Sequence, residues 1–153
     1  MVKVNKVGHV VLAVRDPEAS AKWYSEVLGM DIMYYNEKGK MAFLSFGTQH
    51  HDIAVVKAPE DATLGSPGIS HTALQIEGGL DELKELYQRM KDKGVEIDFT
   101  TDHGLSLSVY FFDPDGNRLE VYCETMTTDE GIDFMRAGRA GRDPLELEAT
   151  SAS

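Results

Sequence analysis

Hydrophobic and polar residues alternate in two short segments that share one pattern. The segments are residues 8–14 and 70–76, and each has a histidine at its second position, His9 in the first and His71 in the second. Alternation with a period of two is typical of a strand that is buried on one face. The chain therefore predicts two sister strands whose histidines are equivalent and lie 62 positions apart.

An amphipathic helix is predicted after each of these strands. In the first helix, Asp16 suits the N-cap, Pro17 suits the first helical position, and Gly29 suits the C-terminal end. Apolar residues at helical spacing indicate the face that each helix buries. The predicted face of the first helix is Ala19, Trp23 and Val27, with Tyr24 and Leu28 beside them. That of the second is Leu80, Leu83, Leu86, Tyr87 and Met90.

Three further strands are predicted after each helix. They lie near residues 31–35, 40–46 and 51–57 in the first half, and near residues 96–100, 107–112 and 118–123 in the second. A strong turn signal, the Asp-Pro-Asp-Gly-Asn of residues 113–117, separates the last two. Each half reads as strand, helix and three strands, so the predicted fold class is α+β with two βαβββ modules.

The chain length of 153 residues is typical of one domain. We expect a single domain over residues 1–123, with module one at about 5–57, a linker at 58–68 and module two at about 69–123. Residues 124–153 are predicted to form a C-terminal extension, with a short helix near 128–137 and then a flexible polar tail.

Composition and charge narrow the function and the location. The formal net charge of −11 argues against nucleic acid and against an anionic membrane surface as partners. No apolar run approaches the ~20 residues that span a bilayer, and the N-terminus lacks an apolar signal segment. The lone cysteine, Cys123, fits a reducing compartment, so a cytoplasmic protein is expected.

The two histidines and one carboxylate suggest a metal site. His9, His71 and Glu120 make up two imidazoles and a carboxylate, a set that binds non-haem Fe(II) and leaves coordination positions open. Glu120 lies in a strand of apolar residues, where a carboxylate is costly unless it is paired or metal-bound. A pair with Arg118 or with a lysine is the alternative, and a lone strand histidine is more often a hydrogen-bonded polar residue.

Three more residues are candidates for chemistry. Asp115 is midway between positions 110 and 120, so a symmetric hairpin puts Tyr110 across from Glu120 on the same face. His51 is expected to share a face with Ile53 and Val55, and His103 lies in a loop just before the strand of Tyr110. Taken singly, Tyr110 reads as a core aromatic residue and His103 as a loop residue.

Five stretches match a known family. They are His9-Val-Val-Leu-Ala-Val, Trp23-Tyr-Ser-Glu-Val-Leu-Gly-Met, His51-Asp-Ile-Ala, His103-Gly, and Tyr110-Phe-Phe-Asp-Pro-Asp-Gly-Asn-Arg-Leu-Glu120. With them the chain resembles the vicinal-oxygen-chelate (glyoxalase/bleomycin resistance/dioxygenase) superfamily over roughly residues 5–123. Within that superfamily it is similar to a one-domain type I extradiol catechol dioxygenase.

The resemblance implies a fold, a cofactor and a reaction. It implies a curved mixed sheet around a central metal cleft, with Fe(II) held by His9, His71 and Glu120. Mn(II) accepts the same ligands. His51 would be the acid–base residue, and His103 and Tyr110 would contact the substrate. The implied activity is meta-cleavage of a catechol-type diol by O2 in aromatic hydrocarbon catabolism. A homo-oligomer is expected for a separate reason, because a two-module unit with exposed sheet edges often pairs.

Alternatives come from the same superfamily. By resemblance, a glyoxalase-like lyase or isomerase would have four metal ligands, the fourth being an extra Glu on the last strand of the first module. Ile53 occupies the inward position that we assign to that ligand. A metal-dependent resistance protein would use the same ligand triad. A non-enzymatic drug-binding module has no need of such a triad.

Overall fold

The computed structural model describes residues 7–38, 40–65 and 69–147. The chain divides into two compact units, residues 1–65 and 66–153, and the division falls within the stretch assigned to the linker. Each unit mixes helix and strand, which confirms the α+β class and the two βαβββ modules. Among the described residues, no helix has both the length and the apolar character to cross a membrane.

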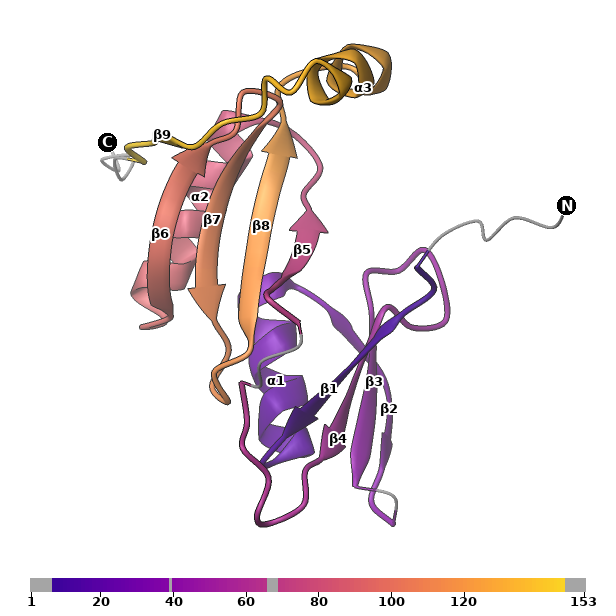
Figure 1. Cartoon of the computed structure of the whole chain (residues 1–153). Coiled ribbons are helices and arrows are strands. Elements are labelled where there is room, and N and C mark those ends of the chain that lie inside the picture. The colour runs from indigo at the N-terminus through magenta and orange to yellow at the C-terminus, as the bar shows by residue number, and fades with distance from the viewer. Residues whose placement is uncertain (1–6, 39, 66–68, 148–153) are drawn as a thin grey trace, which may run out of the picture. The chain divides into compact units, whose positions relative to one another are not determined.

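The first unit is a four-stranded mixed sheet with one helix (Figure 1). Its elements are β1 (Val10–Val14), α1 (Pro17–Leu28), β2 (Asp31–Asn36), β3 (Met41–Ser45) and β4 (Ile53–Lys57). The strand order is β1-β4-β3-β2, and β1 pairs with β4 in parallel while the other pairs are antiparallel. The helix packs against β2, β3 and β4, so one face of this sheet is covered.

Helix α1 begins and ends where the sequence predicts. The Asp16 side chain accepts hydrogen bonds from the backbone N–H groups of Glu18 and Ala19, and Gly29 takes a positive φ of 71° after the last turn. The buried face overlaps the predicted one at Tyr24 and Val27 and departs from it elsewhere. It consists of Pro17, Ser20, Ala21, Tyr24 and Val27, whereas Ala19 is exposed. The stripe is rotated because Tyr24, not Trp23, points fully into the core.

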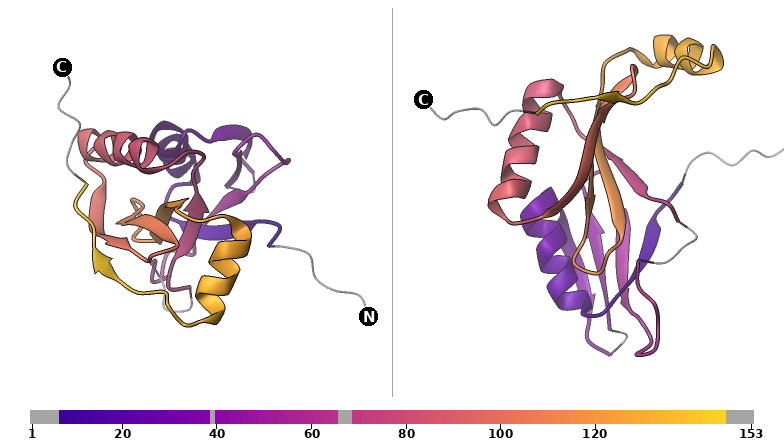
Figure 2. Two further views of the ribbon diagram at one scale, coloured as in Figure 1. Left: turned by 90° about the horizontal axis from the view of Figure 1, so that it is seen from above. Right: turned by 60° about the vertical axis from the view of Figure 1, so that its left-hand side comes forward.

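The second unit repeats this plan and adds a C-terminal segment (Figures 1 and 2). Its elements are β5 (Thr72–Gln75), α2 (Leu80–Asp92), β6 (Glu96–Asp102), β7 (Ser106–Phe112), β8 (Arg118–Glu124), α3 (Thr128–Arg136) and β9 (Asp143–Pro144). The strand order is β5-β8-β7-β6-β9, with β5 parallel to β8. Helix α2 lies on one face of the sheet and α3 lies beyond the ends of the strands (Figure 2).

The C-terminal segment differs from the expected flexible tail as far as Leu147. Strand β9 pairs with β6, and Leu147 is 7% exposed. The predicted helix is present as α3, which Thr127 caps through reciprocal hydrogen bonds with Glu130. Residues 148–153 of the predicted tail lie outside the described part of the chain.

Both units contain the same irregularity. The β2–β3 register shifts between Ile32 and Tyr34, and the β6–β7 register shifts between Ile97 and Phe99. Such a bulge inserts one residue and changes which side chains share a face. After the bulge, a row of four directly paired residues crosses each sheet. The rows are Tyr34, Phe43, Ala54 and Val11 in the first unit, and Phe99, Tyr110, Glu120 and Ala73 in the second.

Candidate active site

Glu120 and His71 form a close pair in the second unit. Glu120 is on β8 between the fully buried Leu119 and Val121, which lie on the face covered by α2. Alternation therefore turns the Glu120 side chain to the opposite face, where it is 8% exposed. His71 immediately precedes β5, and its Nε2 lies 3.1 Å from Glu120 Oε2.

This pair suits a metal. One carboxylate oxygen and one imidazole nitrogen face each other, and both are ligand atoms that Fe(II) and Mn(II) bind. A buried carboxylate also gains most from a neighbouring cation, because burial removes its hydration. The alternative pairing with Arg118 is wrong, since Arg118 pairs with Asp98 at 2.5 Å.

Tyr110 lies beside Glu120, as the symmetric hairpin predicts. The two residues are directly paired between β7 and β8, and Tyr110 is 4% exposed. Burial raises the pKa of the Tyr110 hydroxyl, and the negative charge and hydrogen bond of Glu120 raise it further. Tyr110 therefore stays a neutral phenol that can donate a hydrogen bond.

His103 is brought to the same place by the loop between β6 and β7. Its Nε2 lies 3.2 Å from the Tyr110 hydroxyl, which makes these two side chains hydrogen-bond partners. The structure thus joins four of the six predicted site residues on one face of one sheet. The contacts run from His71 to Glu120, then to Tyr110 and then to His103.

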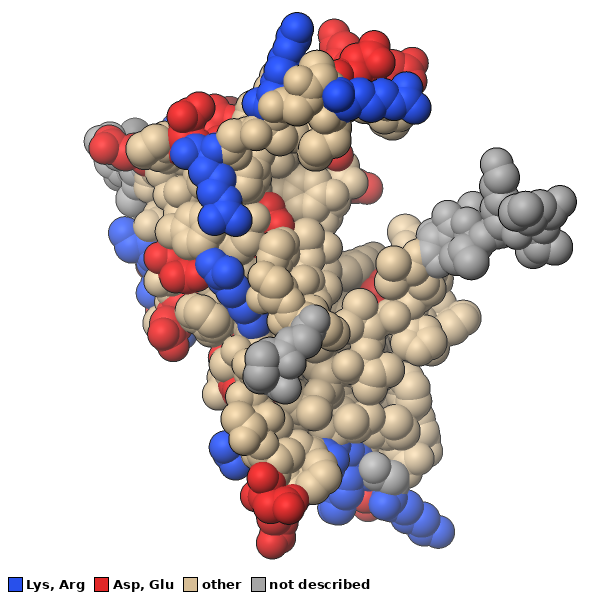
Figure 3. All heavy atoms as spheres, viewed as in Figure 1, with Lys and Arg blue, Asp and Glu red and all other residues tan. Residues whose placement is uncertain are grey.

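Three residues at this site were not predicted as functional. Phe99 stacks on the Tyr110 ring at 4.4 Å and 15°, the Arg118 guanidinium lies 5.1 Å from the Tyr110 ring, and Arg142 lies 5.9 Å from the Phe99 ring. Figure 3 shows basic and acidic side chains side by side over the second unit. The bulge at residues 97–99 hides Phe99 from simple alternation, and no local pattern links Arg142 to the sheet.

His9 and His51 lie together in the first unit. Their ring centroids are 4.5 Å apart, and the His51 ring is also 5.3 Å from Phe43. Partial burial lowers the pKa of His51, and the charges of the neighbouring His50 and His9 lower it further, against an opposing effect of Asp52. His51 therefore favours the neutral form, in which it can accept a proton.

The face assigned to His51 in the sequence analysis is wrong. The His51 ring contacts Phe43, which pairs with Ala54. Ile53 pairs instead with Leu44, on the opposite face, which α1 covers. The alternation does not extend back to His51, because β4 begins at Ile53 and the chain bends at Asp52.

The same register corrects the position of the missing fourth ligand. In the row of the first unit, Ala54 stands where Glu120 stands in the second, so Ala54 and not Ile53 is the counterpart. Neither residue can bind a metal, and the lack of a carboxylate at this position is unchanged. His9 and His71 also correspond, since each immediately precedes the first strand of its module.

The complete triad of His9, His71 and Glu120 stays a prediction. Its members belong to two units, and within either unit the described residues contain no group of three His, Cys, Asp or Glu side chains that could hold a metal. The second unit brings together two of the predicted ligands, His71 and Glu120, and the first unit places the third, His9, beside His51.

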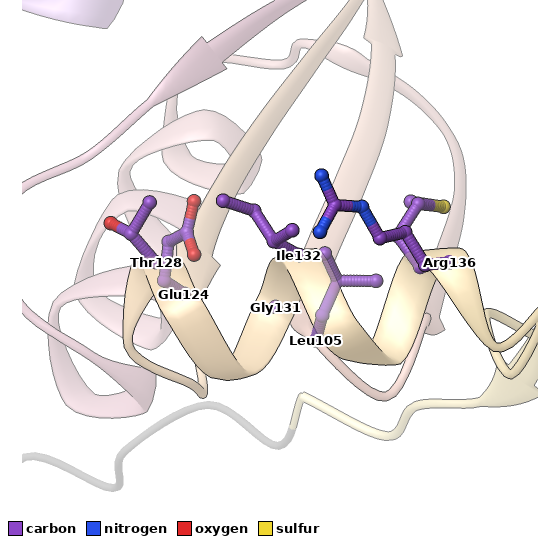
Figure 4. Close-up of a pocket in the computed structure, with 7 residues that line it drawn as sticks. Leu105, Glu124, Thr128, Gly131, Ile132 and Arg136 are labelled. Carbon is purple, nitrogen blue, oxygen red and sulfur yellow. The ribbon is translucent and has the colours of Figure 1, made fainter.

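A pocket elsewhere in the second unit contains none of the predicted site residues. It lies between α3 and the ends of β7 and β8 (Figure 4). Its lining residues are Leu105, Glu124, Thr128, Gly131, Ile132, Met135 and Arg136.

A family model and two relatives from comparison with known proteins point to the same protein family. Residues 6–121 match the model of the Glyoxalase/Bleomycin resistance protein/Dioxygenase superfamily. The chain is 34% identical to biphenyl-2,3-diol 1,2-dioxygenase 2 of Rhodococcus globerulus over 149 residues, which are 95% of this chain and 77% of the relative. It is 32% identical to biphenyl-2,3-diol 1,2-dioxygenase 3 of the same organism, over 92% of this chain and 75% of the relative.

A solved structure shares the fold. The fosfomycin resistance protein FosX of Listeria monocytogenes, complexed with Mn(II) and sulfate, superposes with a TM-score of 0.68 at 22% identity, over 88% of this chain and 99% of that protein. The family model, the two relatives and the paired βαβββ modules agree. This chain belongs to the glyoxalase/bleomycin resistance/dioxygenase superfamily.

Proposed function

We propose that this protein is an Fe(II)-dependent extradiol dioxygenase, which opens an aromatic diol next to its hydroxyl groups and adds both atoms of O2. The observation that carries the proposal is the pairing of buried Glu120 with half-buried His71, with Tyr110 and His103 in contact beside it. The two relatives named as biphenyl-2,3-diol dioxygenases support it, since they align with nearly the whole chain.

In this proposal His9, His71 and Glu120 hold the metal. The close approach of Glu120 Oε2 and His71 Nε2 supports two of these assignments. The third rests on the equivalence of His9 and His71 in the repeated modules. Bound Fe(II) supplies Lewis-acid polarisation of the diol hydroxyls and an open position for O2, and Mn(II) accepts the same donors.

The remaining residues bind the diol and move its protons. Tyr110 keeps its proton because its pKa is raised, so it can donate a hydrogen bond to a substrate oxygen that gains negative charge. His51 is the proposed base for a phenolic proton, since its pKa is lowered and its neutral ring can accept one. His103 acts next to Tyr110, through their hydrogen bond.

The test is oxygen uptake by metal-loaded protein. The protein is loaded with Fe(II) or Mn(II) without air and then mixed with catechol, 3-methylcatechol or biphenyl-2,3-diol in air-saturated buffer. We expect stoichiometric O2 uptake and a yellow ring-opened product from at least one diol. Glu120→Gln should abolish both, while Glu124→Gln, at the exposed end of the same strand, should not.

Protein that retains its metal and consumes no O2 with any diol refutes the proposal. Turnover of a hemithioacetal without O2 would instead identify the lyase alternative, and tight ligand binding by metal-free protein would identify the drug-binding alternative. Light scattering measures whether the protein forms the expected homo-oligomer, and fractionation of cells tests the expected cytoplasmic location.

A further inference from the structure

The C-terminal segment reaches the candidate site by a route that the proposed function does not use. After α3 the chain returns to the C-terminal end of β6, where β9 pairs with Thr101 and Asp102, and we name residues 139–147 the C-terminal strap (Figures 1 and 2). Thr101 Oγ1 donates a hydrogen bond to the carbonyl of Asp143 at 3.0 Å, and Thr100 Oγ1 donates to the carbonyl of Leu145. The strap is therefore fixed to β6 by backbone pairing and by two side-chain hydroxyls.

The strap contacts both the side chain and the backbone of His103. The Gly141 carbonyl oxygen lies 2.7 Å from His103 Nδ1, and the Gly141 N–H donates to the His103 carbonyl at 3.3 Å. A backbone carbonyl can only accept a hydrogen bond, so Nδ1 must carry a hydrogen. A neutral imidazole carries one hydrogen, and its Nε2 is then an acceptor.

The position of the ring hydrogen on His103 decides the direction of the hydrogen bond between His103 Nε2 and the Tyr110 hydroxyl. Tyr110 has one hydroxyl hydrogen and two acceptors within reach, His103 Nε2 and the Glu120 carboxylate. In the protein without substrate, an acceptor Nε2 turns the Tyr110 hydrogen toward His103. In the proposed reaction a diol oxygen replaces His103 as the acceptor of that hydrogen. If Nε2 carried the hydrogen instead, it would donate to the Tyr110 oxygen and turn the Tyr110 hydrogen toward Glu120.

We infer that Gly141 of the C-terminal strap is a positioning residue, which holds neutral His103 in the Nδ1–H form and thereby leaves the Glu120 carboxylate free to bind metal. The inference deepens the proposed function and rests on it for the role of Glu120. Gly141, 17 positions after the end of β8, thus controls how strongly the Glu120 carboxylate can donate to a metal, although Gly141 does not touch Glu120.

The tautomer is measurable without metal or substrate. Two-bond proton–nitrogen correlation spectra of 15N-labelled, metal-free protein distinguish a protonated ring nitrogen from an acceptor nitrogen. The signals of His103 are assigned with His103→Gln. At about pH 8 we expect Nδ1 protonated and Nε2 unprotonated. The Nε2–H form in the unmodified protein overturns the inference.

Release of the strap should change the tautomer. The double variant Thr100→Val, Thr101→Val removes both hydroxyls while keeping the β-branched shape, and Thr128→Val on α3 is the matched control. We expect the double variant to gain the Nε2–H form and to bind Mn(II) about 10-fold more weakly, the lower end of the usual effect of outer ligand partners. The control should match the unmodified protein in both measurements.

A double variant that keeps the Nδ1–H form with the strap released shows that the strap does not set it, and this overturns the inference. If the variant does not fold, the spectrum of the unmodified protein still decides the tautomer. The outcome is separate from that of the proposed function. A protein with the Nδ1–H form and no diol cleavage refutes the function and leaves the strap's effect on His103 in place.

Discussion

Replacement of Tyr110 by phenylalanine tests the hydroxyl at the centre of the candidate site. The change removes the oxygen 3.2 Å from His103 Nε2 and keeps the ring that stacks on Phe99 at 4.4 Å. The Arg118 guanidinium, 5.1 Å from the ring centroid, also keeps its contact. The variant should therefore fold, with a loss of about 1 kcal/mol for the missing hydrogen bond.

The expected effect on turnover is much larger. A donor that stabilises developing negative charge in a site shielded from water contributes about 2.7–4 kcal/mol, which corresponds to a rate factor of about 10²–10³. Tyr110 is 4% exposed, so water cannot readily replace its hydroxyl. Because the donor acts in the transition state, we expect kcat and kcat/KM to fall together and KM to change little.

The assay is steady-state O2 uptake by iron-loaded protein, with the iron content measured for each sample. Tyr87→Phe on α2 is the matched control, because it removes a tyrosine hydroxyl from the helix on the other face of the same sheet. A Tyr110→Phe variant that retains iron and turns over as fast as the control would refute the role of this hydroxyl. A rise in KM at unchanged kcat would reduce that role to substrate binding.

Further predictions concern the metal, the base, a helix end and the thiol. Glu120→Gln should lower metal affinity in a titration with Mn(II), because it removes the charge of the proposed carboxylate ligand. His51→Phe should keep its iron and lose about 10²–10⁴ in kcat, the usual contribution of a proton-transfer group, and full activity would exclude His51 as the base. Hydrogen bonds from the Thr127 backbone and hydroxyl lower the pKa of Glu130 in the folded protein. The ionised Glu130 side chain therefore stabilises the fold above its unfolded-state pKa of about 4.3. This contribution to the free energy of unfolding is lost as the pH falls below that pKa. Chemical denaturation at two pH values should show this loss in the unmodified protein and not in Glu130→Gln. Burial raises the pKa of Cys123, which is 1% exposed, so thiol reagents should react with it only after unfolding.

The sequence predicts the modules well because local rules determine them. The cap at Asp16, the end of α1 at Gly29 and the hairpin that pairs Tyr110 with Glu120 each depend on a few adjacent residues. These features need no knowledge of distant contacts. His71 and Glu120, which are 49 positions apart and lie 3.1 Å from each other, are linked in the sequence only by ligand chemistry and the family resemblance.

Other features depend on packing or on distant segments, which a pattern does not contain. The bulge before Phe99 breaks the alternation, and the bend at Asp52 separates His51 from the face of Ile53. The pairing of Asp143 and Pro144 with β6 joins residues about forty positions apart. Alternation can be read along a strand, but a change of register is visible only when the partner strand is known.

The C-terminal strap also has a consequence for association between chains. In the second sheet β9 covers part of the outer edge of β6, while in the first sheet the equivalent strand, β2, is the last in the order. β2 exposes three apolar side chains, Ile32, Met33 and Tyr34, at 48%, 52% and 61%. An uncovered strand edge offers backbone hydrogen bonds to another chain. The two modules arise from one pattern, yet among the described residues only the second sheet has this edge paired with a further strand, so self-association and aggregation should begin at β2.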